Sequence, residues 1–242
     1  MNTKRFYGKG LPGVDLDSLK GQLIVVEGAD GSGRSTQIGL LRDWLEHRGY
    51  PTANVGLKRS MLVSDELEQA MQGNILGNRT LALFYATDFA DQLENRIIPA
   101  LRAGFIVLAD RYIYTLMARA IVRGAEPAWI REVYSIAIVP DAVFYIHVSP
   151  PTLVERNLRR DAALDYWESG MDIYRSTNMY QSFIMYQRQI QKEFKSMQTV
   201  YGFDRIDGNR TPRSVQRELQ AKIEVILNGK PGAGPKTELM AK

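Results

Sequence analysis

The chain of 242 residues contains no cysteine, which excludes disulfide bonds and thiolate metal sites. No apolar run comes near the roughly 18 residues that a bilayer-spanning helix needs, and the first residues lack the hydrophobic stretch of a secretory signal. We therefore expect a protein of the reducing cytoplasm that has no membrane partner.

The middle of the chain has no net basic charge, because the net charge of +4 comes from its two ends. Residues 1–10 hold three basic side chains and no acidic one, and residues 230–242 hold three basic against one acidic. The intervening segment therefore carries a net charge of −1. Nucleic-acid binding requires a basic surface on the folded part, so we expect no nucleic-acid partner.

The most informative stretch, residues 23–45, reads LIVVEGADGSGRSTQIGLLRDWL. Its apolar start is typical of a buried parallel strand, and apolar residues at helical spacing follow a start near Ser35. Between the two lies a glycine-rich turn. A strand, a turn spaced Gly-x4-Gly-Lys-Ser/Thr and a helix form the P-loop of nucleotide-binding proteins. This stretch matches that pattern, except that Arg34 replaces the lysine.

The loop residues suit the phosphates of ATP for separate physical reasons. Glycine lets the backbone approach an anion and turn its N–H groups toward it, and the helix N-terminus adds partial positive charge. The expected ATP-binding residues are Gly28, Ala29, Asp30, Gly31, Ser32, Gly33, Arg34, Ser35 and Thr36. Ser35 would also ligate the Mg2+ that accompanies ATP. The alternative is a glycine-rich turn that binds no ligand.

The rest of the chain alternates between strand and helix patterns. Short apolar runs predict strands at 52–57, 105–108, 142–148 and 203–207, and helical spacing predicts helices at 80–103, 114–123, 127–136, 151–161, 174–201 and 212–227. This alternation predicts an α/β fold, a three-layer α/β/α sandwich with a mostly parallel central sheet. We place the folded domain at residues 21–229, between an irregular N-terminal extension (1–20) and a tail (230–242) expected to be disordered.

Charged side chains follow two of the predicted strands, at the sheet edge where parallel α/β folds bind ligands. Asp110, after the strand at 105–108, suits a Walker-B role in holding Mg2+ through water. Arg111 beside it can pair with an acceptor phosphate. Arg59 follows the strand at 52–57 and is a candidate for binding a second phosphate. The alternatives are a plain Asp–Arg turn and a solvated loop charge.

An arginine-rich segment at 156–172 follows the strand at 142–148. Arg156, Arg159 and Arg160 lie in its helical part. Because the segment precedes a long helix in a chain that already has a phosphate loop, we interpret it as a short lid that folds over ATP. A solvated helical face is the alternative.

Four pieces of the sequence resemble thymidylate kinases and occur in the same order. They are EGADGSGRSTQ in the phosphate loop, ADRY at 109–112, VSPP at 148–151 and RIDGNR at 205–210. The resemblance covers roughly residues 21–227. It implies an enzyme that transfers the γ-phosphoryl group of Mg-ATP to a nucleoside monophosphate, giving the diphosphate. It also implies a homodimer packed through helices like those at 80–102 and 114–123.

The resemblance further implies roles for individual residues. Asp30 would lie near the acceptor and organise the metal site, and Arg59 and Arg111 would hold the acceptor phosphate. The residues implied as catalytic are Asp30, Arg34, Arg111, Arg156 and Arg160. For ATP binding the resemblance implies Arg159, Asn209 and Arg210, of which the last two would border the adenine. For the acceptor it implies Phe89, Thr115 and Arg119. For the metal it implies Ser35 and Asp110.

The acceptor pocket departs from the family pattern, whereas the phosphate-binding residues mostly follow it. Phe89 stands where thymidylate kinases usually have an arginine that reads thymine. Leu116 occupies a position where the family commonly has a polar residue of the base pocket, and Arg119 occupies one where it commonly has a tyrosine. The leading prediction is a thymidylate-kinase-like nucleoside monophosphate kinase, with dTMP as the first acceptor to test. One alternative is the same fold acting on a different acceptor. The other is an impaired nucleotide-binding or regulatory protein, because the fork of Arg34 is bulkier and directed differently from a lysine ammonium.

Overall fold

A computed structural model of the chain describes residues 4–72, 76–174 and 178–229. Five parallel strands form one sheet in the order β2-β3-β1-β4-β5. The strands are β1 (Gln22–Glu27), β2 (Thr52–Gly56), β3 (Ile106–Asp110), β4 (Ala142–His147) and β5 (Asp204–Asp207). The sheet confirms the predicted P-loop α/β class, and it is parallel throughout rather than mostly parallel.

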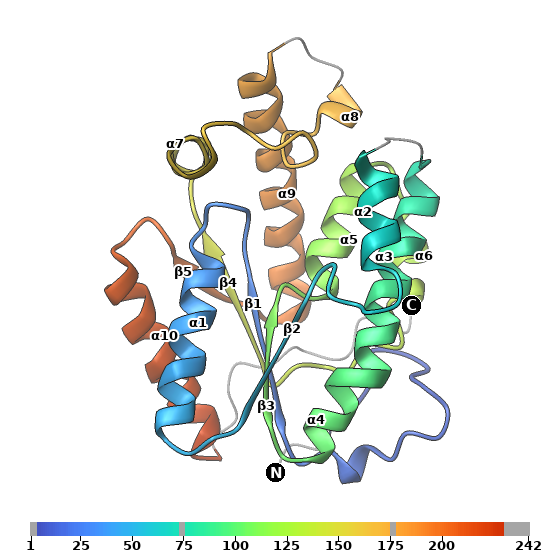
Figure 1. Cartoon of the computed structure of the whole chain (residues 1–242), viewed down its shortest axis with the longest axis vertical. Coiled ribbons are helices and arrows are strands. Elements are labelled where there is room, and N and C mark those ends of the chain that lie inside the picture. The colour runs from blue at the N-terminus through green and yellow to red at the C-terminus, as the bar shows by residue number, and fades with distance from the viewer. Residues whose placement is uncertain (1–3, 73–75, 175–177, 230–242) are drawn as a thin grey trace.

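The two faces of the sheet are covered by different helices (Figure 1). On β1, Leu23 and Val25 face one apolar cluster, whereas Ile24 and Val26 face the other. The first cluster lies under α3 (Asn78–Gln92), α5 (Ile113–Val122) and α9 (Met179–Tyr201), and the second under α1 (Arg34–His47) and α10 (Pro212–Leu227). Because successive strand side chains alternate between faces, a continuous apolar strand such as β1 needs helices on both sides. The three layers follow from this.

Most predicted helices are present, with shifted ends. The further helices are α2 (Ser64–Gln72), α4 (Ile98–Arg102), α6 (Pro127–Val133), α7 (Pro150–Asp161) and α8 (Met171–Tyr174). The helix predicted at 80–103 is α3 continued through a π-helical turn, Leu93–Ile97, into α4. The helix α10 begins as expected, because the Thr211 side chain accepts a hydrogen bond from Ser214 N and Pro212 follows it.

One helix was missed, and one helix was predicted to begin too early. The helix α2 was missed, because Leu67 and Met71 are its only buried residues and its first turn is acidic. The helix predicted from residue 174 begins instead at Met179, since Asn178 is extended and its side chain accepts a hydrogen bond from Gln181 N. Residues 175–177 lie outside the described residues. None of the helices in the described ranges is long and apolar enough to cross a membrane.

The described part of the N-terminal extension packs against the segment before β4. Tyr7 N donates to Ala137 O at 2.9 Å, and Gly8 N donates to Ser135 O at 2.8 Å. The carboxylate of Asp141 accepts from Lys4 and, at 2.7 Å, from the backbone N–H of Leu23 at the start of β1. These contacts join the extension to the central strand. Residues 1–3 and the predicted tail at 230–242 lie outside the described residues.

The strand register places the functional loops at one edge of the sheet. Asp110 is level with Val26 on β1 and with Gly56 on β2. The phosphate loop after β1, the loop after β2 and Arg111 after β3 therefore leave the sheet side by side. The helix α7 and the chain that follows it lie above this edge in Figure 1.

Candidate active site

The phosphate loop joins β1 to the N-terminus of α1. Gly31 and Gly33 have φ of 82° and 86°, a left-handed conformation that side chains with a Cβ rarely adopt. Gly33 is the residue before α1, and no side chain caps the helix there. The loop borders a cavity of about 210 Å³, lined by Ala29, Asp30, Gly31, Gly33, Arg34, Ser35, Thr36, Arg156 and Arg160. An uncapped helix N-terminus beside such a cavity fits a polyphosphate.

The Arg34 side chain is 7% exposed and makes several contacts at once. Its Nε donates to Asp110 Oδ1, and its Nη1 donates to Gly28 O and, at 3.4 Å, to Ala29 O. Its Nη2 lies 3.6 Å from Asp30 Oδ1. One guanidinium therefore joins the loop backbone to the end of β3 while also lining the cavity, which a lysine ammonium is too compact to do.

The predicted metal ligands Ser35 and Asp110 lie together. Ser35 Oγ donates to Asp110 Oδ2 at 3.0 Å, and Arg59 Nη2 lies 3.3 Å from the same oxygen. Burial raises the pKa of Asp110, but the charge and hydrogen bond of Arg34, together with the charge of Arg111 and the hydrogen bond of Ser35, hold the pKa below its ordinary value, so the carboxylate is ionised. Among the described residues no group of three or more His, Cys, Asp or Glu could hold a metal ion. Two oxygens suit Mg2+, which usually takes its remaining ligands from phosphates and water.

A chain of alternating charges leads away from the loop. Arg111 has φ of 71°, and its Nη2 lies 2.8 Å from Asp30 Oδ1 and 3.6 Å from Glu168 Oε1. The same Glu168 oxygen accepts from Arg119. Burial raises the pKa of Asp30, but Arg111 and Arg34 together lower it well below its ordinary value. The sequence prediction missed Glu168, which lies within the predicted lid and is 7% exposed.

The lid arginines divide into two groups. Arg156 Nη1 donates to Gly31 O at 3.3 Å and its Nη2 donates to Gly208 O at 2.9 Å, so it joins the lid to the phosphate loop. Arg160 lines the same cavity. Arg159 does not line it, and its exposed side chain pairs with Glu155 at 2.6 Å. The structure thus brings Arg156 and Arg160, but not Arg159, to the predicted ATP site.

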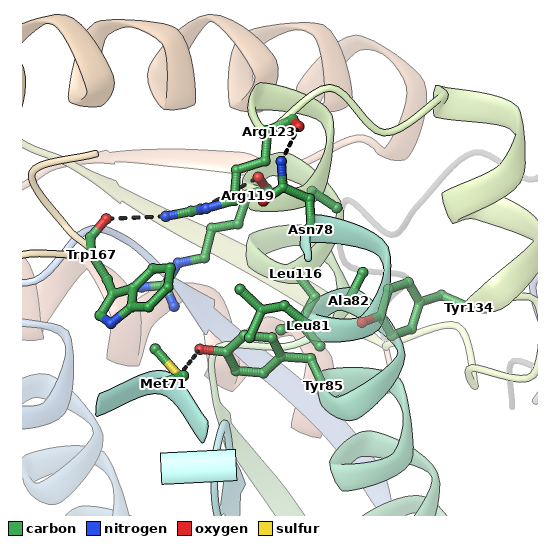
Figure 2. Close-up of a pocket in the computed structure, with 11 residues that line it drawn as sticks. Met71, Asn78, Leu81, Ala82, Tyr85, Leu116, Arg119, Arg123, Tyr134 and Trp167 are labelled. Atoms are coloured by element: carbon green, nitrogen blue, oxygen red, sulfur yellow. Dashed lines mark hydrogen bonds between the residues drawn. The ribbon is translucent and has the colours of Figure 1, made fainter. Parts of the chain in front are cut away.

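An apolar slot adjoins the far end of the charged chain (Figure 2). It is lined by Met71, Asn78, Leu81, Ala82, Tyr85, Leu116, Arg119, Ala120, Arg123, Tyr134 and Trp167. Arg119 belongs both to the slot and to the charged chain, so the two are continuous. The sequence prediction named Leu116 and Arg119 but missed Tyr85, which lies one helical turn before Phe89 and could have been found from that spacing.

Comparison with known proteins supplies the family. A family model described as thymidylate kinase matches residues 26–223. The chain belongs to the thymidylate kinase family. It is 38% identical over 205 residues to a probable thymidylate kinase 2 of Saccharolobus solfataricus, covering 84% of this chain and 95% of the relative. It is 29% identical over 217 residues to a thymidylate kinase of Shouchella clausii, covering 86% of this chain and 97% of the relative.

Family membership makes the chain a thymidylate-kinase-like nucleoside monophosphate kinase, an ATP-dependent phosphotransferase.

In this member of the thymidylate kinase family, two predicted acceptor residues lie in the protein interior. The Thr115 hydroxyl donates to the buried Glu27 carboxylate, whose pKa burial raises. Phe89 is buried edge-on against Tyr112 and Tyr134. Neither residue lines the slot.

The two residues predicted to border the adenine follow β5. Asn209 Oδ1 accepts from Ser149 N at 3.4 Å, and Asn209 N donates to Asp207 at 3.0 Å. Arg210 Nε donates to Asp207 O at 3.1 Å, and Arg210 also pairs with Glu218. The turn lies beside the Gly208 carbonyl that Arg156 contacts, so it adjoins the lid without lining the phosphate cavity.

Proposed function

We propose that this kinase transfers the γ-phosphoryl group of Mg-ATP to dTMP, giving dTDP and ADP. The observation that carries the proposal is the position of Asp30. Its side chain lies in the phosphate-loop cavity and also pairs with Arg111 at 2.8 Å. A phosphate donor on the loop and a phosphate acceptor on Arg111 would therefore meet at this one residue. The names of the relatives, thymidylate kinases, supply dTMP as the acceptor.

On the donor side, the loop from Gly28 to Thr36 would bind the ATP phosphates through its N–H groups. Arg34, Arg156 and Arg160 would neutralise the charge that builds up on the transferred group. Ser35 and Asp110 would hold Mg2+, which would neutralise negative charge on the phosphates. Asn209 and Arg210 would border the adenine, and Arg159 would reach ATP only after its pair with Glu155 opens.

On the acceptor side, Arg111 and Arg59 would hold the monophosphate against the donor. Both guanidiniums are already close to carboxylates, Arg111 to Asp30 and Arg59 to Asp110, so their forks are oriented before the acceptor arrives. Phosphoryl transfer demands mainly alignment and charge neutralisation. No general base is needed.

Two further points belong to this proposal. We propose a homodimer packed through α3, α4 and α5, with the half-exposed Leu83 of α3 as a contact. Light scattering on the purified protein tests it, and a monomer contradicts it. The reducing cytoplasm remains the proposed compartment, on the basis of the chain's lack of cysteine.

The function is tested by coupled ADP release with Mg-ATP and a panel of dTMP, dUMP, CMP, UMP, AMP and GMP. We expect dTMP to be turned over at roughly 1–100 per second, the usual range for kinases. The absence of ADP release with every monophosphate at high enzyme concentration, while ATP still binds, would overturn the proposal and leave a nucleotide-binding protein.

A further inference from the structure

The apolar slot begins where the acceptor-phosphate arginines end. Arg119 lines the slot and contacts Glu168, whose other neighbour is Arg111 at 3.6 Å. Resting on the proposed function, an acceptor whose phosphate lies at Arg111 would place the part beyond its sugar toward Arg119. That part is the base. Concave, mostly apolar pockets of this kind are where small ligands bury their flat rings.

Donor side chains beside the slot make hydrogen bonds within the protein (Figure 2). Asn78 Nδ2 donates to Arg123 O at 2.9 Å, and Tyr85 Oη donates to Met71 Sδ at 3.2 Å. Arg119 Nη2 contacts Glu168. The protons that make these bonds are directed at groups of the protein and not at a base in the slot, and Asn78 and Arg119 each keep further N–H groups.

Arg123 is the most heavily bonded of the polar residues around the slot. Its Nε lies 2.8 Å from Asp172, its Nη1 donates to Tyr186 Oη at 2.7 Å and its Nη2 donates to Trp167 O at 3.2 Å. Its guanidinium also lies over the Trp167 ring, 5.7 Å from its centre. Arg123 therefore fixes the Trp167 wall of the slot.

The remaining lining is apolar or aromatic. Leu81, Ala82 and Leu116 come from α3 and α5, and they are buried. The slot holds only about 30 Å³, far less than a pyrimidine ring, so a wall has to move for a base to enter. Trp167 is the wall on the lid. The base would then contact aliphatic side chains and the aromatic rings of the lining.

We propose that this slot selects the acceptor base by shape and apolar contact, and does not read the hydrogen-bonding edge of the ring. The substrate class is therefore 5-methylpyrimidine deoxynucleoside monophosphates in general, not dTMP alone. A site built to hydrogen-bond a substrate rejects an analogue with the wrong polar groups by about 10⁴–10⁵, whereas an apolar pocket discriminates one methyl group by only about 10–200-fold.

The decisive comparison is between dTMP and 5-methyl-dCMP, which have nearly the same outline but opposite donor and acceptor groups at ring position 4. We expect their kcat/KM values to agree within about tenfold, and that of dUMP, which lacks the methyl group, to be about 10–200-fold lower. A preference of a thousandfold or more for dTMP over 5-methyl-dCMP overturns the inference.

Equilibrium binding of the same nucleotides, measured by calorimetry, separates this inference from the proposed function. Turnover of none of them would defeat the proposed function alone. The Kd ratio of dTMP to 5-methyl-dCMP would still decide the slot: agreement within about tenfold supports shape selection, and a thousandfold difference overturns it.

Two variants probe the slot itself. Tyr85→Phe keeps the ring and removes the hydroxyl, so the ratio between dTMP and 5-methyl-dCMP should stay within about threefold of its wild-type value. A tenfold change would mean that the hydroxyl reads the base.

Leu116→Ala widens the slot and should favour 5-iodo-dUMP over dTMP by about tenfold. Its matched control, Leu40→Ala on the exposed face of α1, should leave that preference unchanged, and an unchanged preference in Leu116→Ala would count against shape selection.

Discussion

In the proposed function, the phosphate loop and the apolar slot would recognise their ligands through opposite kinds of chemical groups. The loop is a contiguous segment, Gly28–Thr36, that uses backbone N–H groups, a helix N-terminus and a guanidinium. The slot is assembled from α2, α3, α5, Tyr134 and the lid, and it uses aliphatic and aromatic surface. Charge-based recognition needs few atoms in fixed directions, and a local motif can supply them. Shape-based recognition needs a surface on every side, which only tertiary structure can supply.

The largest difference is expected between two neighbouring arginines of the lid. Arg156→Ala removes a cation that lines the phosphate cavity and contacts Gly31 O, so kcat should fall by about 10²–10³. Arg159→Ala removes an exposed partner of Glu155 and should change kcat by less than about threefold. Steady-state kinetics with saturating dTMP measures both. Equal losses would mean that the lid rearranges when ATP binds.

Arg34→Lys tests whether the guanidinium is the better residue in this loop. The lysine keeps the charge but cannot hold Asp110 and the Gly28 carbonyl together, so we expect kcat/KM to fall about tenfold and the free energy of unfolding to fall by about 1 kcal/mol. Kinetics and urea denaturation check the two values. A rise in kcat would instead support the view that Arg34 blunts phosphoryl transfer.

Arg123→Lys acts on the slot side of the comparison. It breaks the forked contact with Asp172 and loosens the hold on Trp167, so the KM for dTMP should rise about tenfold. The KM for ATP should stay within twofold, because Arg123 does not line the phosphate cavity. Initial rates with each substrate varied in turn measure both constants. A parallel rise in both would show that the slot and the loop are not independent.

The smallest effect concerns pH and the carboxylate of Asp30, which joins the phosphate loop to Arg111. The folded-state pKa of Asp30 is lowered, with Arg111 and Arg34 outweighing burial, so its ionised form stabilises the fold. This stabilisation is complete above its unfolded-state pKa of about 4 and is lost as the pH falls through the lower folded-state value. Denaturation between pH 3 and 7 should show wild type losing stability at the acid end. Asp30→Asn should lose less, and identical acid slopes would contradict this account.

The sequence predicted the loop, Asp110, Arg111 and the layer architecture, because each depends on local spacing and on the rule that parallel strands end at one edge. It could not predict that Arg34 turns toward Asp110, since several partners lie within reach of a guanidinium. It also missed Glu168 and Trp167. Their roles arise from contacts with α5 across about 50 residues of sequence, and an irregular polar segment carries no periodic pattern that would reveal them.

The position of β1 in the sheet has a consequence for the nascent chain during synthesis. This strand is the first to be synthesised, yet in the folded sheet it lies in the middle, between β3 and β4. Its two partner strands are complete only after the ribosome has passed Asp110 and then His147. At roughly 5–20 residues per second, the apolar LIVV segment waits about 4 to 17 seconds for β3 alone. The N-terminal extension waits longer, because its anchor Asp141 comes later. A tag or a truncation at this end therefore changes which residues of the nascent chain are exposed before their partners have been synthesised.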